Sequence, residues 1–318
     1  MDKIIFLQPI FQERIWGGRN LEKFGFDIPA GNIGEAWVIA AHDNGSSIIS
    51  NGSMKDLSLK EAYEKNPLLF TEKKYEKFPL LIKILDASDN LSVQVHPDDD
   101  YANKHENGEL GKTECWYVLD SKKNSKLIYG HTAKTKEQFD DKIDNEQWSD
   151  LFIEERVKKD DFFYIPAGTL HAIGSGILIY EVQQNSDTTY RVYDFDRIDK
   201  NGNSRELHIE KTKNVTTVPF NKVTPEKEIS KIDNAIITKL VEEKYFTVAK
   251  IELDGSANIE KNATGSLFTV INGSGLVIID NHSYAIKKGD SFILTTACKN
   301  YKLEGNLFLI TSFDNQNL

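Results

Sequence analysis

Hydrophobic and polar residues alternate in many short runs along the chain, with the period of two that is typical of half-buried β-strands. Clusters rich in Gly, Asn, Asp and Pro separate these runs and indicate turns. The pattern predicts a mainly β protein built from short strands. The clearest runs are GEAWVIAAH (34–42), FPLLIKILDA (78–87), LSVQVH (91–96), ECWYVLD (114–120), FFYIPAG (162–168), GILIYEVQQ (176–184) and YRVYDF (190–195).

Helical periodicity is confined to short stretches. Residues 58–66 predict a helix that opens with a capping box, Ser58 to Glu61, and ends before a proline. A second short helix is expected to begin at Asp98. Two further apolar patterns of helical spacing lie near 134–152, and we expect them to form a small helical insertion that caps the barrel without chemistry of its own.

The composition of the chain changes at residues 219–231, where charged residues and two prolines are typical of a linker. We place the linker at 221–231, between a catalytic domain at 1–220 and a second β domain at 232–318. In the second domain, turn signals recur between short β runs at the spacing expected of a sandwich or barrel.

The 318 residues carry a formal net charge of −10, with a pI near 5.3. No basic block is present, which disfavours nucleic acid as a partner. The N-terminal apolar run is too short for a signal peptide and no stretch is long enough to span a bilayer, so we expect a cytoplasmic protein without membrane contact. Cys115 and Cys298 stand alone, and Cys115 is interpreted as a buried apolar residue rather than a reactive thiol.

Side chains suited to a divalent metal recur at the ends of three runs. Strand alternation places Gln94 and His96 on one face. Glu114 opens a second run, and His171 follows a Pro-Ala-Gly turn in which Gly168 supplies the unusual backbone angles. Imidazole and carboxylate ligands suit zinc, iron, nickel or manganese. A histidine in a strand is more often a hydrogen-bonded core or surface residue than a ligand, but the pairing of Gln-x-His with Pro-x-Gly-x-x-His favours a metal site.

Charged residues near these runs suggest further chemistry. Lys83 is the only charged residue among the apolar positions of LLIKIL, so it either has a buried partner or anionic ligand, or extends its ammonium to solvent at a strand edge. Lys112 stands two residues before Glu114, which puts both side chains on one face of a strand. Because the chain is acidic, a phosphorylated ligand would need a local cluster of cations, for which Lys83, Lys112 and Arg191 are candidates.

Six segments carry a more specific pattern: PIFQERIWGGRNLEKFG (9–25), GEAWVIAAH (34–42), PLLIKILDASDNLSVQVHPD (79–98), GKTECW (111–116), PAGTLHAIG (166–174) and EVQQNSDTTYRVYDFDR (181–197). The His96 strand and the Pro-x-Gly-x-x-His turn resemble the two half-motifs of the cupin superfamily. Together, the segments resemble the type I mannose-6-phosphate isomerases of the short bacterial kind. This resemblance implies cupin-type jelly-roll barrels, with a metal-binding N-terminal barrel and a smaller, degenerate C-terminal cupin-like β domain that binds no metal.

The resemblance also implies a set of site residues. One zinc ion per chain would be held by Gln94, His96, Glu114 and His171. Arg191 would be the catalytic arginine, which either stabilises developing charge or grips the phosphate of the substrate.

Further roles follow from the resemblance with alternatives left open. Lys112 would assist at the metal or at the phosphate, and Glu181 and Asp187 compete for the proton-transfer role. The expected substrate contacts are Lys83, Ser92 and Trp16. Without the resemblance, the tryptophan would be interpreted as a core residue.

The implied reaction is the reversible conversion of mannose 6-phosphate to fructose 6-phosphate through a cis-enediol, carried out by a monomer or weak homodimer. Two alternatives use the same kind of site: an iron-dependent cupin dioxygenase, and a metal-dependent sugar-binding cupin without turnover. The cluster of Glu181, Asp187 and Arg191 favours an enzyme over a binder, since a binder has little need of it.

Overall fold

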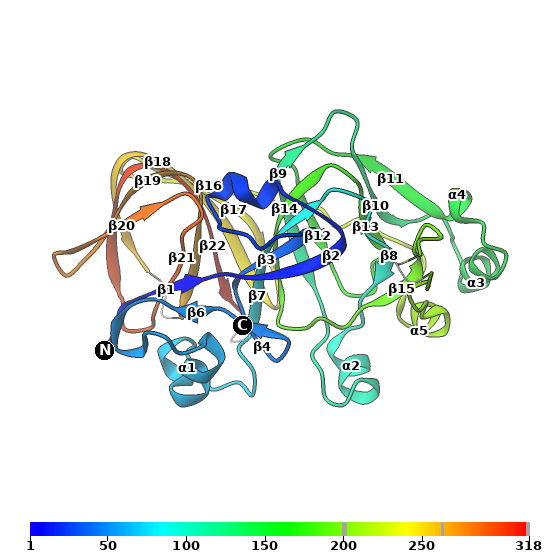
Figure 1. Ribbon diagram of the computed structural model, residues 1–318, viewed down its shortest axis with the longest axis horizontal. Coiled ribbons are helices and arrows are strands. Elements are labelled where there is room, and N and C mark those ends of the chain that lie inside the picture. Colours follow the sequence, from blue (N-terminus) through cyan, green and yellow to red (C-terminus); the bar gives the residue numbers. More distant parts are fainter. Residues whose placement is uncertain (199–201, 262–263, 316–318) are drawn as a thin grey trace.

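The computed structural model describes residues 1–198, 202–261 and 264–315, and its strands form two β regions side by side along the longest axis of the molecule (Figure 1). The chain is mainly β, as the alternation of its sequence predicts, and the strands pair in antiparallel sheets. Among the described residues, no helix has the length and apolar character needed to cross a membrane.

Two sheets form the walls of a barrel in the N-terminal region. Trp116 and Ile179 of one sheet and Leu127 and Ile173 of the other share a hydrophobic cluster, so the two sheets face each other. In sheet order, the six-stranded wall consists of β12 (Phe162–Ile165), β9 (Glu114–Ser121), β14 (Ile177–Gln184), β7 (Leu80–Ala87), β3 (Ile33–Ile39) and β2 (Ile10–Gly18). The five-stranded wall consists of β11 (Phe152–Arg156), β10 (Lys126–His131), β13 (His171–Ile173), β8 (Val93–Val95) and β15 (Tyr190–Tyr193). A separate two-stranded sheet pairs β4 (Ala41–His42) with β5 (Gly45–Ser46).

The outer face of the six-stranded sheet packs against the C-terminal region. Cys115 and Tyr117 of β9 share a hydrophobic cluster with Phe246 and Ile310 of that region. Because side chains alternate across a strand, the intervening Trp116 points into the barrel instead. Cys115 is fully buried and unpaired, as expected.

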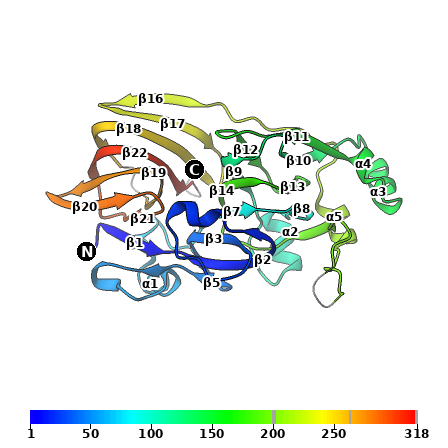
Figure 2. The ribbon, with the colours of Figure 1, turned by 45° about the horizontal axis from the view of Figure 1, so that its top comes forward.

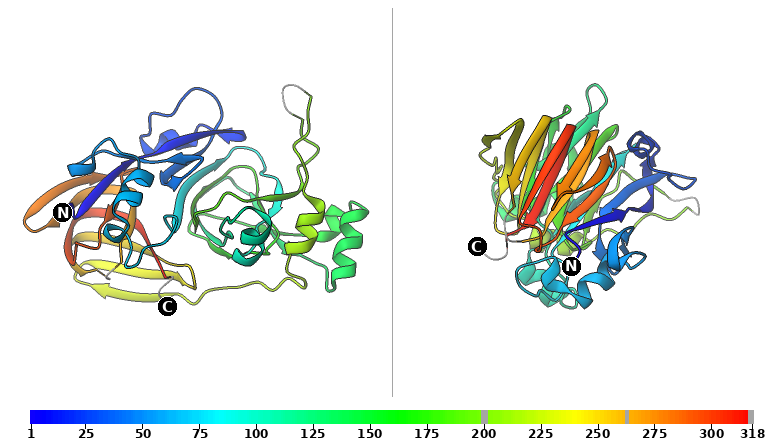
Figure 3. Two further views of the ribbon diagram at one scale, coloured as in Figure 1. Left: turned by 90° about the horizontal axis from the view of Figure 1, so that it is seen from below. Right: turned by 90° about the vertical axis from the view of Figure 1, so that its left-hand side faces the viewer.

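The C-terminal region is one nine-stranded sheet, seen nearly face-on in the right-hand view of Figure 3. Its hydrophobic face includes Phe268 and Phe292, whose rings stack with their centroids 5.0 Å apart. In order, the strands are β16 (Glu228–Ile232), β17 (Ala235–Glu242), β18 (Phe246–Glu260), β22 (Asn300–Asp314), β19 (Ser266–Ile279), β21 (Ser291–Leu294), β1 (Ile4–Gln8) and β6 (Ile48–Ile49), while β20 (His282–Lys287) pairs with β19.

The predicted division of the chain needs correction at two places. Strand β1 pairs with β21 and with β6, so two segments of the expected 1–220 domain, Ile4–Gln8 and Ile48–Ile49, belong to the C-terminal sheet. The linker prediction is wrong for the last residues of 221–231, because Glu228 to Lys231 form most of the edge strand β16 and pair with β17 (Figure 2). Charged residues at this position suit an exposed sheet edge as well as they suit a linker.

The helices are short and lie outside the barrel walls. Ser58 caps α1 by accepting a hydrogen bond from the Glu61 N–H while Glu61 accepts from Ser58, which confirms the capping box. Asp98 caps α2, as predicted. The helices are α1 (Leu59–Lys65), α2 (Asp99–His105), α3 (Lys136–Asp144), α4 (Trp148–Leu151) and α5 (Ile209–Val215), with short 3-10 helices at Asn20–Phe24, Gly52–Met54 and Pro67–Leu69.

The helical insertion lies at the far end of the N-terminal region, at the right of Figure 1. Phe139 and Ile143 of α3 share a hydrophobic cluster with Val93 and Val95 of β8. Those valines alternate with Gln94, so they face outward from the five-stranded sheet. The expectation of a cap over the barrel is therefore wrong in its position: the apolar stripe of the helix covers the outer face of one wall.

We predict that Ile5→Ala lowers the free energy of unfolding by about 2–5 kcal/mol, because Ile5 is only 1% exposed in the core between the two regions. Ile229→Ala is the matched control: Ile229 is 70% exposed on the edge strand, and a change within about 0.5 kcal/mol is expected. Chemical denaturation of the two variants measures both values. An equal, small effect at both positions would show that β1 does not stabilise the sheet.

Candidate metal centre and its cavity

Segments distant in sequence bring three ligand-type side chains together between the barrel walls. His171 of β13 lies directly opposite Gln94 of β8 in the five-stranded sheet, and His96 follows β8. Glu114, the first residue of β9, reaches them from the six-stranded sheet. The candidate ligand atoms of His96, Glu114 and His171 lie within 4.8 Å of one another, and all three residues are buried. This group could hold a metal ion.

A glycine turn fixes the approach to His171. Gly168 has φ +82°, in the left-handed region that favours glycine, and its N–H donates a 2.8 Å hydrogen bond to the His96 carbonyl. A Cβ atom here would lie 2.5 Å from the Thr217 hydroxyl oxygen. The turn predicted from the Pro-Ala-Gly sequence therefore ties the two histidine segments to each other.

The two imidazoles direct unprotonated nitrogens at Glu114. Nδ1 of His96 lies 2.8 Å from the Thr188 carbonyl oxygen, and Nδ1 of His171 lies 2.9 Å from that of Thr169. Because a carbonyl only accepts, each Nδ1 carries the hydrogen and each Nε2 keeps its lone pair. Those Nε2 atoms lie 3.7 Å (His96) and 3.3 Å (His171) from the carboxylate oxygens of Glu114.

Burial keeps both histidines neutral. It lowers the pKa of His96 well below its usual value and that of His171 to about 3, and the positive charge of Lys112 acts in the same direction. Oε1 of Glu114 is buried without a hydrogen-bond partner among the described residues. Two imidazole lone pairs and a carboxylate oxygen that face one another are ligand types that a divalent metal prefers, so the donor set fits such an ion.

Two more polar side chains adjoin this group. The amide nitrogen of Gln94 lies 3.4 Å from Nε2 of His171, so rotation of this amide would bring its oxygen to the position of a fourth ligand. The ammonium of Lys112 bonds to Oε2 of Glu114 and lies 3.1 Å from Nε2 of His96. Burial opposes the charge of Lys112, but the carboxylates of Glu114 and Glu181 outweigh it and raise the lysine pKa. Lys112 therefore remains an ammonium beside the candidate metal centre, as its spacing from Glu114 predicts.

A cavity of about 290 Å³ opens beside the metal-ligand group. Its size approaches that of small-molecule sites. All seven of the predicted catalytic and substrate-contact residues line this cavity, together with Gln94. They are Trp16, Lys83, Ser92, Lys112, Glu181, Asp187 and Arg191.

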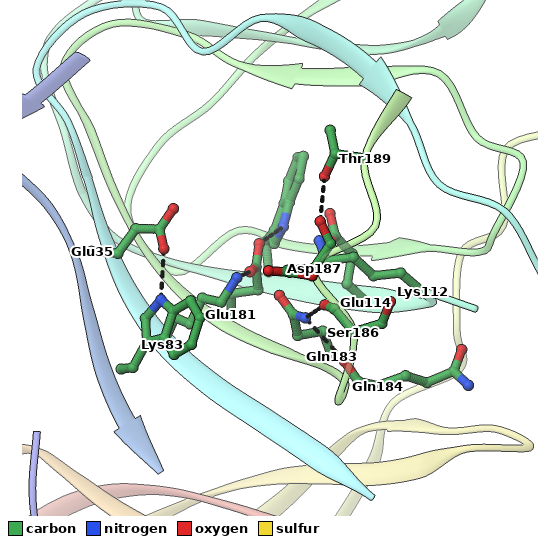
Figure 4. A network of polar contacts seen from close by, with 12 residues as sticks. Glu35, Lys83, Lys112, Glu114, Glu181, Gln183, Gln184, Ser186, Asp187 and Thr189 are labelled. Carbon is green, nitrogen blue, oxygen red and sulfur yellow. Dashed lines mark hydrogen bonds and ion pairs between the residues drawn. The ribbon is translucent and has the colours of Figure 1, made fainter. Parts of the chain in front are cut away.

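The two candidate proton-transfer carboxylates have different surroundings. Glu181 is buried: its Oε1 lies 3.5 Å from the Lys83 ammonium, and its Oε2 accepts a 2.9 Å hydrogen bond from Nε1 of Trp116 (Figure 4). Burial, with the charge of Glu114 next, raises the pKa of Glu181. The Asp187 side chain is 41% exposed and accepts a hydrogen bond from Asn44. Glu181 thus lies at the enclosed part of the cavity and Asp187 at its rim.

Lys83 and Arg191 differ in the partners of their charged groups. Lys83 is only 6% exposed and has a buried carboxylate partner, so the alternative of an ammonium extended to solvent is wrong. Nε of Arg191 donates to the Ser92 hydroxyl at 3.1 Å, and its Nη1 donates to the Glu206 carbonyl at 3.0 Å. Both of these acceptors are neutral, so no carboxylate of the described residues is bonded to the guanidinium, which can pair with an anion in the cavity.

The chain is similar to proteins of a known family along nearly its whole length. Two family descriptions match the chain: "Phosphomannose isomerase type I, catalytic domain" over residues 4–124 and "Mannose-6-phosphate isomerase, cupin domain" over residues 236–314. The chain is 48% identical to mannose-6-phosphate isomerase ManA of Bacillus subtilis over 97% of its own length and 98% of that protein. The chain belongs to the type I mannose-6-phosphate isomerase family. A member from Streptococcus mutans is 46% identical over 99% of this chain and all of that protein.

Solved structures of the isomerase family confirm the cupin-type fold. The crystal structure of mannose 6-phosphate isomerase from Bacillus subtilis matches with a TM-score of 0.95 and 42% identity, over 98% of this chain and 100% of that one. A putative mannosephosphate isomerase from Archaeoglobus fulgidus has the same fold at 22% identity, with a TM-score of 0.78 over 98% of each chain.

Charged and aromatic side chains that were not predicted as site residues also line this isomerase cavity, namely those of Arg14, Glu35, Trp37 and Arg205. Glu35 and Trp37 alternate on one face of the GEAWVIAAH run, which a period-two reading could have found. Only the tertiary structure shows that this face points into the barrel. We find no local signal for Arg205, whose guanidinium is held by Asp194.

We predict that Glu114→Gln abolishes stoichiometric metal binding, because it removes the only carboxylate of the candidate ligand group. Elemental analysis of the purified protein would then find the metal content reduced by about tenfold or more. His282→Ala is the matched control, since His282 is an exposed histidine in the β20 hairpin and should leave the metal content unchanged. Retention of a full equivalent of metal by Glu114→Gln would contradict this assignment.

Proposed function

We propose that the chain interconverts mannose 6-phosphate and fructose 6-phosphate through a cis-enediol, with zinc held by Gln94, His96, Glu114 and His171. The observation that carries this proposal is the convergence of two neutral imidazole nitrogens and a buried carboxylate beside a cavity lined by charged residues, in a member of this isomerase family. When bound, zinc would polarise the oxygens on C1 and C2 of the opened sugar.

Glu181 is the residue we assign to proton transfer. The reaction moves a proton between C1 and C2, which requires a base that later returns the proton as an acid. Burial raises the pKa of Glu181, which brings a carboxyl group closer to this double role. The Asp187 side chain is 41% exposed, so we assign it to the rim of the substrate site.

Cations of the cavity offset the negative charge of the substrate. Arg191 donates only to neutral groups among its described hydrogen bonds, so its guanidinium can pair with the developing enediolate or with the phosphate. Lys112 keeps an ammonium beside the candidate metal ligands, where negative charge on the sugar oxygens would develop. We propose Lys83, Ser92 and Trp16 as substrate contacts because they line the same cavity.

We predict that a chelator-stripped protein loses turnover of mannose 6-phosphate and regains it when zinc is added. The reason is that polarisation of the sugar oxygens needs a Lewis acid that the side chains do not replace. A coupled assay for fructose 6-phosphate measures the recovery. Equal rates with and without oxygen are expected, whereas a requirement for oxygen would favour the iron-dependent dioxygenase.

We predict that Glu181→Gln lowers kcat by about 10²–10⁴-fold, the usual contribution of a positioned acid or base. Asp187→Asn should lower kcat by less than about tenfold, since it removes a charge at the rim and not the proton carrier. Steady-state kinetics of the two variants with metal content measured in parallel distinguishes the roles. The reverse order of effects would transfer the proton-transfer role to Asp187.

A further inference from the structure

One row of four side chains crosses the inner face of the six-stranded sheet. In the strand register, Trp37 of β3 lies opposite Lys83 of β7, Lys83 lies opposite Glu181 of β14, and Glu181 lies opposite Trp116 of β9. Directly opposite residues of antiparallel strands have Cβ atoms about 4.5–5.5 Å apart. The row therefore places a cation and a carboxylate side by side, with an indole ring at each end.

The contacts follow this order. The Lys83 ammonium lies 5.2 Å from the centroid of the Trp37 ring and 3.5 Å from Oε1 of Glu181. Trp116 donates to the other oxygen of Glu181 at 2.9 Å. Each carboxylate oxygen of Glu181 is thus held by one partner, and the partner on the Lys83 side is itself placed over an aromatic face.

A second buried carboxylate fixes the orientation of Trp37. Nε1 of Trp37 donates a 2.6 Å hydrogen bond to Oε2 of Glu35, and Arg14 donates to both oxygens of Glu35 at 3.1 and 3.2 Å. Burial alone would raise the pKa of Glu35, but the charges of Lys83 and Arg14 outweigh it, so the pKa is lowered and Glu35 stays ionised. Figure 4 shows Glu35 and Lys83 on the same side of this network, with Glu181 beyond them.

We propose that Trp37, oriented by Glu35, is a positioning residue that holds the Lys83 ammonium against Glu181. This inference rests on the proposed function, in which Glu181 carries the proton. A lysine side chain has four rotatable bonds, and an ammonium that left this position would no longer hold Oε1 of Glu181. The aromatic face and the fixed indole plane restrict the ammonium to the place where it orients the carboxylate and stabilises its ionised form.

A double-mutant cycle tests this role. Trp37→Leu should lower kcat by about tenfold, the size expected for loss of a desolvated cation–π contact, with KM changed by less than about twofold. In a Lys83→Met background, Trp37→Leu should cause no further loss, because the group it positions is already absent. The single variant Trp37→Phe keeps an aromatic face at this position, so it should retain most of the wild-type kcat.

Two further variants serve as controls. Trp148→Leu replaces a tryptophan that stacks on Phe152 outside the cavity, and its kcat should equal that of the wild type. Glu35→Gln preserves the size of the side chain and an oxygen acceptor while removing the charge. If Trp37→Leu does not fold, Glu35→Gln takes its place in the double-mutant cycle with Lys83→Met. Glu35→Gln should lower kcat by less than Trp37→Leu, and this loss should also disappear in the Lys83→Met background.

The outcomes separate this inference from the proposed function. Losses from Trp37→Leu and Lys83→Met that multiply would overturn the inference, because Trp37 would then act independently of Lys83. A rise in KM with unchanged kcat would also overturn it, since Trp37 would be a sugar contact. Both results require a wild-type protein that turns over mannose 6-phosphate, and absence of that turnover would instead overturn the proposed function.

Discussion

A buried carboxylate that must be compensated is the constraint on which the N-terminal barrel depends. Removing Glu114 from water costs several kcal/mol unless opposite charge and hydrogen bonds replace the solvent. Lys112 supplies one such charge. The two imidazoles are neutral, so they can compensate the carboxylate only by holding a metal cation together with it. Each imidazole is held in the required tautomer by a loop carbonyl, so loops as well as strands position the candidate ligands.

The six-stranded sheet has a polar inner face, and its hydrophobic outer face is covered by the C-terminal region and stabilises the sheet. Cys115 and Tyr117 pack on the C-terminal sheet, while Glu114 and Trp116 of the same strand point into the barrel. The N-terminal strand β1 strengthens this junction, because it precedes the barrel strands in the sequence but pairs with β21 of the C-terminal sheet. The C-terminal region therefore supports the wall that carries Glu114 and Glu181.

The side chains that line the cavity carry a positive net charge, although the whole chain is negatively charged. The protein has a net charge of −10, yet five cationic side chains line the cavity, against three carboxylates. Most of these cations are paired with carboxylates, among them Lys83 with Glu181 and Arg14 with Glu35. Pairing keeps their positions fixed and lowers the field that an anionic sugar meets, and it leaves Arg191 as a cation whose described hydrogen bonds go to neutral groups.

The sequence by itself determined features that depend on near neighbours or on recognisable motifs. The alternation of polar and apolar residues predicted the two faces of β9, and the capping box at Ser58 predicted the start of α1. The resemblance to the family identified residues that line one cavity. Tertiary structure decided the place of β1 in the C-terminal sheet, the position of α3 on the outer face of a barrel wall, and the row from Trp37 to Glu181. The physical reason is that strand register and partner choice arise from packing between segments far apart in the chain, and a local pattern of polar and apolar residues is compatible with several such pairings.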